Sequence, residues 1–345
     1  MYYFLLSSIT FLQLYIPLAK YLNHLGRPVT FIKSSNLKDY ANIYKKPNSK
    51  ILNKTLSKND FIKVVESNAE LLSKVQIIFI VDGDIYGERK QFVKASSIEK
   101  INKNAKIISL QEHHNFRWSY SKFIDKVTYC VFPCESLAKY YNTLSPNNVY
   151  LGNTKFDDIS TDKKYVYNKF SLNSNNKYCL LLYPREIFMK QLNIPFSKTK
   201  HLIEVLEKEL GYTIIVKYRP KDTDGKDLSM YKTVISDVYP NESIELMTVC
   251  ELCVMFSSSC IDECILTDTL CIDCVIDYKD CEKMNYLCDS RIVQRIHHWE
   301  KKSDQEIIDH HNRLIKDSNI FKEFRKEYLF DLNTSAKRII DYIDK

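Results

Sequence analysis

The chain has 345 residues, of which 45% are hydrophobic and 27% are charged, and its formal net charge is +7. The composition is that of an ordinary globular protein rather than a disordered one, and the length favours two domains. The positive charge is spread along the chain, so it is compatible with anionic substrates but, taken alone, indicates no more than solubility.

The first 33 residues allow two interpretations. Residues 2–19 are mostly apolar, as in a signal peptide or a membrane anchor, but they lack a basic start and are interrupted by polar residues. We favour a strand over residues 2–6, a helix over 11–25 and a second strand over 28–32.

The rest of the first half continues this alternation. We expect a helix over residues 60–75 and another that ends at residue 141. Short apolar runs predict buried strands over residues 76–81, 106–110, 127–132 and 148–151. Strands that alternate with helices favour a parallel sheet covered on both faces.

A second alternating pattern begins at residue 178. It predicts strands over residues 178–183, 213–217, 252–256 and 271–276, with helices over 198–210, 243–249 and 260–270. We therefore predict an α/β fold of two Rossmann-like halves. Its parts are an N-terminal domain (1–158), a polar linker (159–177), a second domain (178–303) and C-terminal helices (304–345).

Polar residues follow several predicted strands of the first half. They are Asp82 and Asp84, then Glu112, His113 and His114, then Asn153, Lys155 and Asp157. In parallel sheets ligands bind outside the carboxyl ends of the strands, so this edge is a candidate functional site.

The most informative stretch is residues 251–278. It predicts a buried strand, a turn of Ser257, Ser258 and Ser259, a short helix with Glu263 in its first turn, and another strand. Serine hydroxyls and free backbone N–H groups at such a turn suit an anion, usually a phosphate. The alternatives are an ordinary helix cap for the serines and a helix-dipole partner for Glu263.

Eleven cysteines are present, eight of them between residues 250 and 288. The pairs Cys250/Cys253 and Cys271/Cys274 have the C-x2-C spacing of zinc sites. However, in a strand this spacing points the two sulfurs to opposite faces, and cysteine in an apolar run behaves as a small buried hydrophobe. We therefore expect core packing, no metal and a reducing compartment. The histidine pairs 297/298 and 310/311 are expected on the surface.

Several short motifs resemble those of one enzyme family. The run GNTKFD (152–157) resembles a turn of bacterial lipid sugar transferases, and the three serines followed by Glu263 resemble the donor loop of GT-B glycosyltransferases. The run VKYRPK (216–221) resembles a strand end of CDP-glycerol glycerophosphotransferases, although Arg219 stands where those enzymes have histidine.

This resemblance implies two domains that face each other across a cleft and a metal-independent transfer of sugar from a nucleotide-sugar donor, without another cofactor. It implies that the serine turn holds the donor phosphates and that Glu263 takes the ribose hydroxyls. Arg185, Lys217 and Arg219 follow or end predicted strands and are expected to bind phosphate oxygens, with surface salt bridges as the alternative.

The acceptor hydroxyl needs a general base from the first half. His113 is the first choice because imidazole titrates near neutrality, and Asp82, Asp84 and Glu112 are further candidates. The expected acceptor is a carbohydrate or a lipid-linked sugar, not a nucleic acid. The expected location is the cytoplasm, with peripheral membrane contact for a lipid-linked acceptor.

Three other functions are compatible with the same pattern. A non-hydrolysing nucleotide-sugar 2-epimerase shares the fold and would use the acid and base residues around one sugar. The VKYRPK run suggests a nucleotide-alcohol phosphotransferase, and the small number of glycines suggests a non-catalytic scaffold.

Overall fold

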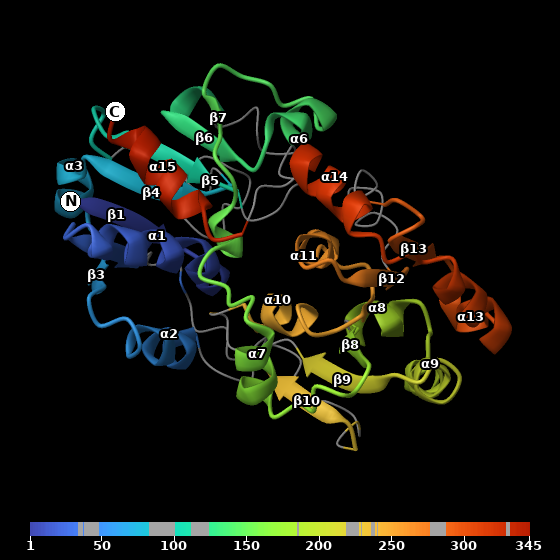
Figure 1. Ribbon diagram of the computed structural model, residues 1–345. Helices are drawn as coiled ribbons and strands as arrows, with labels where there is room; N and C mark the ends of the chain where they lie inside the picture. The colour runs from blue at the N-terminus through green and yellow to red at the C-terminus, as the bar shows by residue number, and fades with distance from the viewer. Residues whose placement is uncertain are drawn as a thin grey trace. The chain divides into compact units, whose positions relative to one another are not determined.

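The structure is a computed structural model, and it describes residues 1–33, 37, 48–82, 101–111, 124–184, 186–218, 228, 230–235, 239, 241–276, 288–328 and 332–345 (Figure 1). The chain forms two compact units. Unit 1 comprises Met1–Asp158, Val238–Pro240 and Glu327–Lys345, and unit 2 comprises Ile159–Asp237 and Asn241–Lys326.

Within the described residues, unit 1 contains a parallel sheet of seven strands in the order β3-β2-β1-β4-β5-β6-β7. The strands are β1 (Tyr2–Leu6), β2 (Val29–Lys33), β3 (Lys63–Glu66), β4 (Ile77–Val81), β5 (Lys106–Leu110), β6 (Tyr129–Phe132) and β7 (Asn148–Tyr150). β1, β4 and β5 lie at the centre of this order and carry mostly buried residues.

Helices cover both faces of this sheet, as a parallel sheet requires. The helices of unit 1 are α1 (Leu12–His24), α2 (Asn48–Leu56), α3 (Ala69–Lys74), α6 (Glu135–Tyr140) and α15 (Ser335–Ile343), with short 3-10 turns η1 (Ile9–Phe11), η2 (Ile124–Lys126) and η3 (Thr154–Phe156). α1 and α15 contribute to one apolar cluster, and α3 and α6 contribute to a second cluster.

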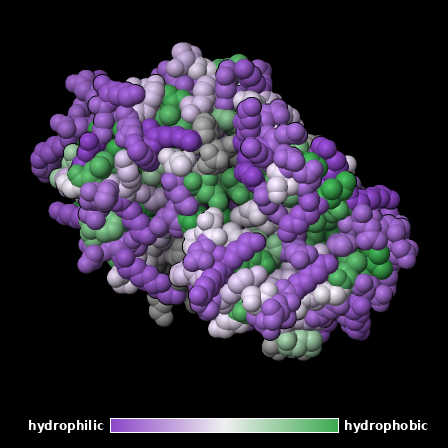
Figure 2. Space-filling model, in the orientation of Figure 1, coloured by the Kyte–Doolittle hydropathy of each residue, from purple (hydrophilic) through white to green (hydrophobic). Residues whose placement is uncertain are grey.

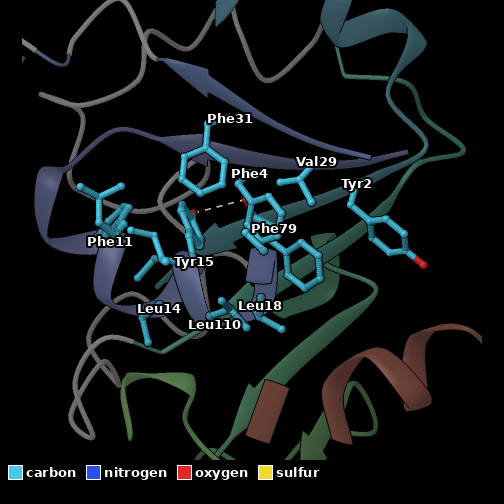
Figure 3. Packing of buried hydrophobic residues seen from close by; sticks show 14 of the residues in the cluster. Tyr2, Phe4, Phe11, Leu14, Tyr15, Leu18, Val29, Phe31, Phe79 and Leu110 are labelled. Carbon is cyan, nitrogen blue, oxygen red and sulfur yellow. Dashed lines mark hydrogen bonds between the residues drawn. The ribbon is translucent and has the colours of Figure 1, made fainter. Parts of the chain in front are cut away.

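Aromatic rings fill the centre of the first cluster (Figure 3). Phe4 on β1 stacks on Phe79 of β4, with 4.7 Å between ring centroids, and Tyr15 of α1 meets Phe4 edge to face. The buried Tyr15 hydroxyl donates to the backbone oxygen of Leu5 at 2.9 Å, so its polar end is satisfied. Residues 2–19 therefore form the core of a β-α unit.

Among the residues that the structure describes, none of the helices has the length and apolar character needed to cross a membrane. On the face drawn in Figure 2, hydrophilic residues cover most of the surface of both units, and apolar residues gather only in small groups.

One predicted element of unit 1 is wrong. Residues 60–75 were expected to form a single helix, but they form β3 and α3. Two adjacent β-branched residues, Val64 and Val65, favour the edge strand. Asn68 then starts α3, because its side chain accepts the N–H of Leu71 at 2.8 Å.

Unit 2 contains, in its described part, a parallel sheet of six strands in the order β10-β9-β8-β11-β12-β13. The strands are β8 (Tyr178–Leu182), β9 (Thr213–Tyr218), β10 (Lys232–Ile235), β11 (Leu252–Met255), β12 (Leu270–Cys274) and β13 (Val293–Ile296). Strands β10 and β13 lie at the two edges and were not predicted, because four residues with charges among them carry little periodic signal.

The helices of unit 2 are α7 (Lys163–Phe170), α8 (Glu186–Gln191), α9 (Phe196–Lys208), α10 (Glu242–Met247), α11 (Ile261–Leu266), α13 (Asp304–Asn312) and α14 (Ser318–Tyr328), with the 3-10 turn η5 (Trp299–Lys301). α7 falls inside the stretch expected to be a linker. Asp162 caps it, and its Lys169 pairs with the buried Glu245 of α10, which ties this segment to unit 2.

The C-terminal helix α15 belongs to unit 1 although α13 lies in unit 2. Its apolar residues Ile339, Ile340 and Ile343 are buried in the same cluster as α1. The predicted α/β fold with C-terminal helices that pack back is confirmed by this arrangement.

Candidate functional site

The strand order of each sheet reverses once. In unit 2 the chain runs from β8 outward to β9 and β10, then returns to the other side of β8 for β11, β12 and β13. The two loops that leave the strands at such a reversal diverge, which opens a crevice outside the carboxyl ends of the strands. The turn that follows β11 is Ser257–Ser259. The serine turn therefore lies at the position in unit 2 where ligands of this fold class bind.

The serine turn is held by several short bonds. Ser257 has a φ of 48°, in the left-handed region. Its N–H donates to Oδ1 of Asp273 at 2.8 Å, and its Oγ accepts the N–H of Ile276 at 2.8 Å. Ser258 is buried and its Oγ accepts the N–H of Cys260 at 3.3 Å, whereas Ser259 is half-buried. The structure thus engages Ser257 in holding the turn and leaves Ser259 the most accessible of the three.

Glu263 lies in the first turn of α11, as predicted, but it is only 2% exposed. The side-chain amide of Asn241 donates to its Oε1 at 3.2 Å. Asn241 precedes α10 in the position of a cap, yet its side chain makes no capping bond. The sequence signal of an asparagine before a helix predicts a cap, so it would not have found this contact.

Asp273 is the site residue that the sequence did not single out. It lies in β12, whose five residues are all buried, and its side chain is 1% exposed. Its Oδ2 accepts from Nε of Arg295 on β13 at 3.1 Å, while its Oδ1 holds Ser257. The available signal was a carboxylate inside an apolar strand, because a buried charge requires a partner.

Of the three predicted phosphate-binding bases, the described residues include Lys217 alone; Arg185 and Arg219 lie outside them. Lys217 is the fifth of six residues in β9 and is buried. Its backbone oxygen accepts the N–H of Tyr183 at 2.9 Å, next to the end of β8. Its backbone therefore lies beside the strand at which the order of the sheet reverses.

Unit 1 has its own reversal, between β1 and β4. Asp82 directly follows β4, is buried, and adopts a left-handed φ of 50°. Its N–H donates to the backbone oxygen of Leu110 at 2.8 Å. The other predicted candidates for the general base, Asp84, Glu112 and His113, lie outside the described residues. Asp82 thus marks the switch point of unit 1.

The GNTKFD turn (152–157) fastens three parts of unit 1. Asn153 donates to the backbone oxygen of Gln111 at 3.3 Å, and Thr154 donates to the backbone oxygen of Leu14 at 2.8 Å. Asp157 accepts the N–H of Ser335 at 3.1 Å and so caps the start of α15. Burial raises the pKa of Asp157 above its usual value, although the backbone N–H groups of Ala336 and Ser335 partly offset this effect. The turn is therefore built into the structure of unit 1.

The interpretation of the cysteines as core residues is confirmed for most of those that the structure describes. Cys250, Cys253, Cys264, Cys271 and Cys274 are all buried as free thiols. Burial raises the pKa of the Cys264 thiol well above its usual range, which makes it a poor nucleophile. Over the described ranges, no group of three or more His, Cys, Asp or Glu side chains is arranged to hold a metal ion.

The interpretation of the histidine pairs is correct for one pair and wrong for the other. His297 and His298 are exposed, as expected. His310 and His311 are half-buried, and they bond to Oε1 of Gln294 at 2.9 Å and to the hydroxyl of Tyr212 at 3.0 Å. Helix α13 packs against α9 and against β13, the strand that carries Gln294.

The chain matches no known family profile and no curated protein sequence. Solved structures resemble it over its full length. Wall teichoic acid polymerase TagF has a TM-score of 0.63 at 13% identity, covering 100% of this chain and 88% of that one. The spinosyn rhamnosyltransferase SpnG, solved with thymidine diphosphate, has a TM-score of 0.59 at 8% identity, covering 100% and 99%. A protein of Listeria monocytogenes assigned as a UDP-N-acetylglucosamine 2-epimerase has a TM-score of 0.59 at 11% identity, covering 99% and 95%.

At these identities the likeness shows the fold alone. The chain has a GT-B-like fold of two Rossmann-like units, which confirms the fold that the resemblance of its motifs implied.

Proposed function

We propose that this protein is a glycosyltransferase of the GT-B type, which moves a sugar from a nucleotide-sugar donor to an acceptor hydroxyl. One observation carries the proposal: the serine turn that resembles a donor loop follows β11 at the switch point of a sheet in the order β10-β9-β8-β11-β12-β13. The likeness of the whole chain to GT-B structures supports the same conclusion.

On this proposal the donor nucleotide binds to unit 2. Ser258 and Ser259 offer hydroxyl and backbone donors to the phosphates, and Glu263 accepts from the ribose hydroxyls. Lys217, with Arg185 and Arg219, balances the negative charge of the leaving nucleotide. Such donors stabilise the leaving group only when they are fixed before the reaction, because reorganising them during bond cleavage would cost free energy.

The acceptor side of the reaction needs a base, and we propose that unit 1 supplies it. The acceptor oxygen forms a bond to the anomeric carbon while the bond from that carbon to the phosphate oxygen breaks. The base takes the proton of the acceptor, and the nucleotide leaves with the electron pair. His113 remains the first choice, with Asp82, Asp84 and Glu112 as further candidates. Asp82 follows the strand beside β1, at which the order of its sheet reverses.

A product assay distinguishes this function from its alternatives. The protein is incubated with UDP-, GDP-, CDP- and dTDP-sugars, with and without glycan and lipid-linked acceptors, and the products are identified by mass spectrometry and NMR. We expect the sugar to be joined to an acceptor hydroxyl, with nucleotide release that depends on the acceptor. His113→Ala is expected to lower turnover by about 100-fold, the lower range for general-base catalysis, at unchanged donor affinity.

Other products would assign other functions. An epimerised sugar formed from UDP-N-acetylglucosamine without acceptor identifies an epimerase. A phosphoalcohol transferred with release of CMP identifies a phosphotransferase. Failure of every nucleotide to bind would indicate a scaffold. If His113→Ala turns over as fast as the wild type, His113 is not the general base. The products of the assay still decide whether the protein is a transferase.

A further inference from the structure

Asp273 occupies an unusual position for an ionised side chain. β12 lies between β11 and β13 in the sheet, and all of its residues are buried. A carboxylate taken out of water costs several kcal/mol unless it is paired and hydrogen-bonded. In this strand each carboxylate oxygen has a charged or polar partner on a different neighbour: Oδ1 meets Ser257, and Oδ2 meets Arg295. If the residue at this position only packed in the core, we would expect it to be apolar.

The register of the sheet explains both contacts. Asp273 lies directly beside Met255 on β11 and directly beside Arg295 on β13. Ser257 is only two residues beyond Met255, so the carboxylate of Asp273 reaches the first N–H of the serine turn. The neighbouring position on β13 supplies the guanidinium as a cross-strand ion pair.

The serine turn needs such support because of its backbone. A non-glycine residue in the left-handed region costs about 1–3 kcal/mol, and Ser257 lies there with a φ of 48°. Glycine adopts this conformation at no such cost, but the chain has only 6 glycines, and none of them lies in this turn. The charge-assisted bond from Ser257 to Asp273 and the bond from Ile276 to Ser257 offset the strain.

We infer that Asp273, with its charge balanced by Arg295, is a positioning residue that fixes the serine turn in the conformation that presents Ser258 and Ser259 to a diphosphate. The choice of ligand rests on the proposed function, whereas the role of Asp273 in shaping the turn does not. Arg295 has a second consequence for binding. Without it, a buried negative charge would lie one hydrogen bond behind the turn and would repel a phosphate.

The experiment compares four full-length variants with the wild type. Asp273→Ala removes the acceptor, Asp273→Asn keeps an acceptor without the charge, and Arg295→Gln leaves the carboxylate unbalanced. Arg325→Gln is the matched control, because Arg325 pairs with Asp268 before the other end of β12. The measurements are hydrogen exchange of the Ser257 amide, the thermal midpoint, and the dissociation constants of nucleoside diphosphates and of the corresponding nucleosides.

We expect the Ser257 amide to exchange about tenfold faster or more in Asp273→Ala, the change that a lost charge-assisted bond predicts, with about tenfold weaker diphosphate binding. Asp273→Asn keeps an acceptor for the Ser257 N–H but loses the charge of that bond, so its rate of Ser257 exchange is expected to lie between those of the wild type and Asp273→Ala. Arg295→Gln is expected to weaken the binding of the diphosphate more than that of the nucleoside. Arg325→Gln changes at most the thermal midpoint. If Asp273 only stabilised the fold, these substitutions would lower the thermal midpoint but would weaken diphosphate binding no more than nucleoside binding.

Two results would overturn the inference. One is an unchanged rate of Ser257 exchange in Asp273→Ala. The other is an equal loss of diphosphate and nucleoside affinity in Arg295→Gln, which decides the question if Asp273→Ala fails to fold. If the wild type binds no nucleoside diphosphate, the proposed function fails by itself, and the exchange measurement still tests whether Asp273 holds the turn.

Discussion

Glu263 is a buried carboxylate in the first turn of α11. The side-chain amide of Asn241, the residue before α10, donates to its Oε1, and burial restricts the movement of the side chain. The carboxylate is therefore oriented before any ligand arrives. Under the proposed function, such an orientation suits a group that accepts hydrogen bonds from the two ribose hydroxyls.

Glu263→Ala is expected to weaken nucleotide binding by about tenfold, the equivalent of one hydrogen bond to a charged group. Glu263→Gln keeps one acceptor oxygen and should lose less. Isothermal titration measures both affinities, and Glu209→Ala on the exposed end of α9 is the control for the substitution itself. If Glu263→Ala binds nucleotides with unchanged affinity, Glu263 is not part of the donor site.

At the residue scale, the sequence predicted which residue types gather at the strand ends but not what each one does. The three serines were predicted as equals, yet Ser257 supports the turn with both its N–H and its Oγ. A carboxylate inside an apolar strand marks Asp273 as unusual, but its role could not be predicted, because that role depends on Arg295 in β13, a strand that had no periodic signal. A local sequence pattern cannot predict a contact with a strand that it does not detect.

At the scale of single elements, α13 packs two neutral imidazoles into unit 2. Burial is the main cause that lowers the pKa of His310 and of His311. Asn312 beside His311, and the carboxylates of Glu306 and Asp309 near His310, act in the opposite direction but more weakly than burial. Burial thus disfavours protonation of both imidazoles in the folded helix, which begins with a capping box at Ser303.

The stability of unit 2 should therefore depend on pH. An unfolded imidazole has a pKa of about 6.5, and both folded values are lower, so the unfolded state binds more protons between these values. This contribution to stability is fully present above pH ~6.5 and is lost as pH falls through the folded pKa values.

Thermal midpoints measured from pH ~7.5 down to pH ~5 test this dependence across the imidazole range. The double variant His310→Gln with His311→Gln should show a shallower decline than the wild type. The control is a double variant of the two exposed histidines, His297→Gln with His298→Asn. If the wild type and the His310/His311 variant decline in parallel, the histidines do not carry the effect.

The elements themselves were predictable where local signals agree. β1 and β5 have the predicted bounds, because each is a mostly apolar run that is followed directly by a polar residue, Ser7 or Gln111. The helix predicted over residues 260–270 is shorter, with α11 ending at Leu266, because Asp268 adopts a left-handed φ of 54° and β12 already begins at Leu270. Where a helix meets a strand within four residues, periodicity cannot place the boundary.

At the scale of the whole molecule, the chain builds a GT-B-like fold with few of the glycines that usually shape ligand-binding turns. Strand order rather than glycine indicates the candidate site: within the described residues both sheets reverse once, and the serine turn and Asp82 follow strands at those reversals. The fold could be predicted because strands and helices alternate along both halves. The choice among transfer, epimerisation and phosphotransfer could not, because the same fold carries all of them.

The most direct test of the donor site is a crystal structure of the protein soaked with UDP, GDP, CDP and dTDP. We predict that a bound nucleotide places its diphosphate within hydrogen-bond distance of Ser258 and Ser259 and its ribose beside Glu263. A nucleotide bound elsewhere, or no nucleotide at saturating concentrations in crystals whose serine turn is accessible to solvent, would contradict it.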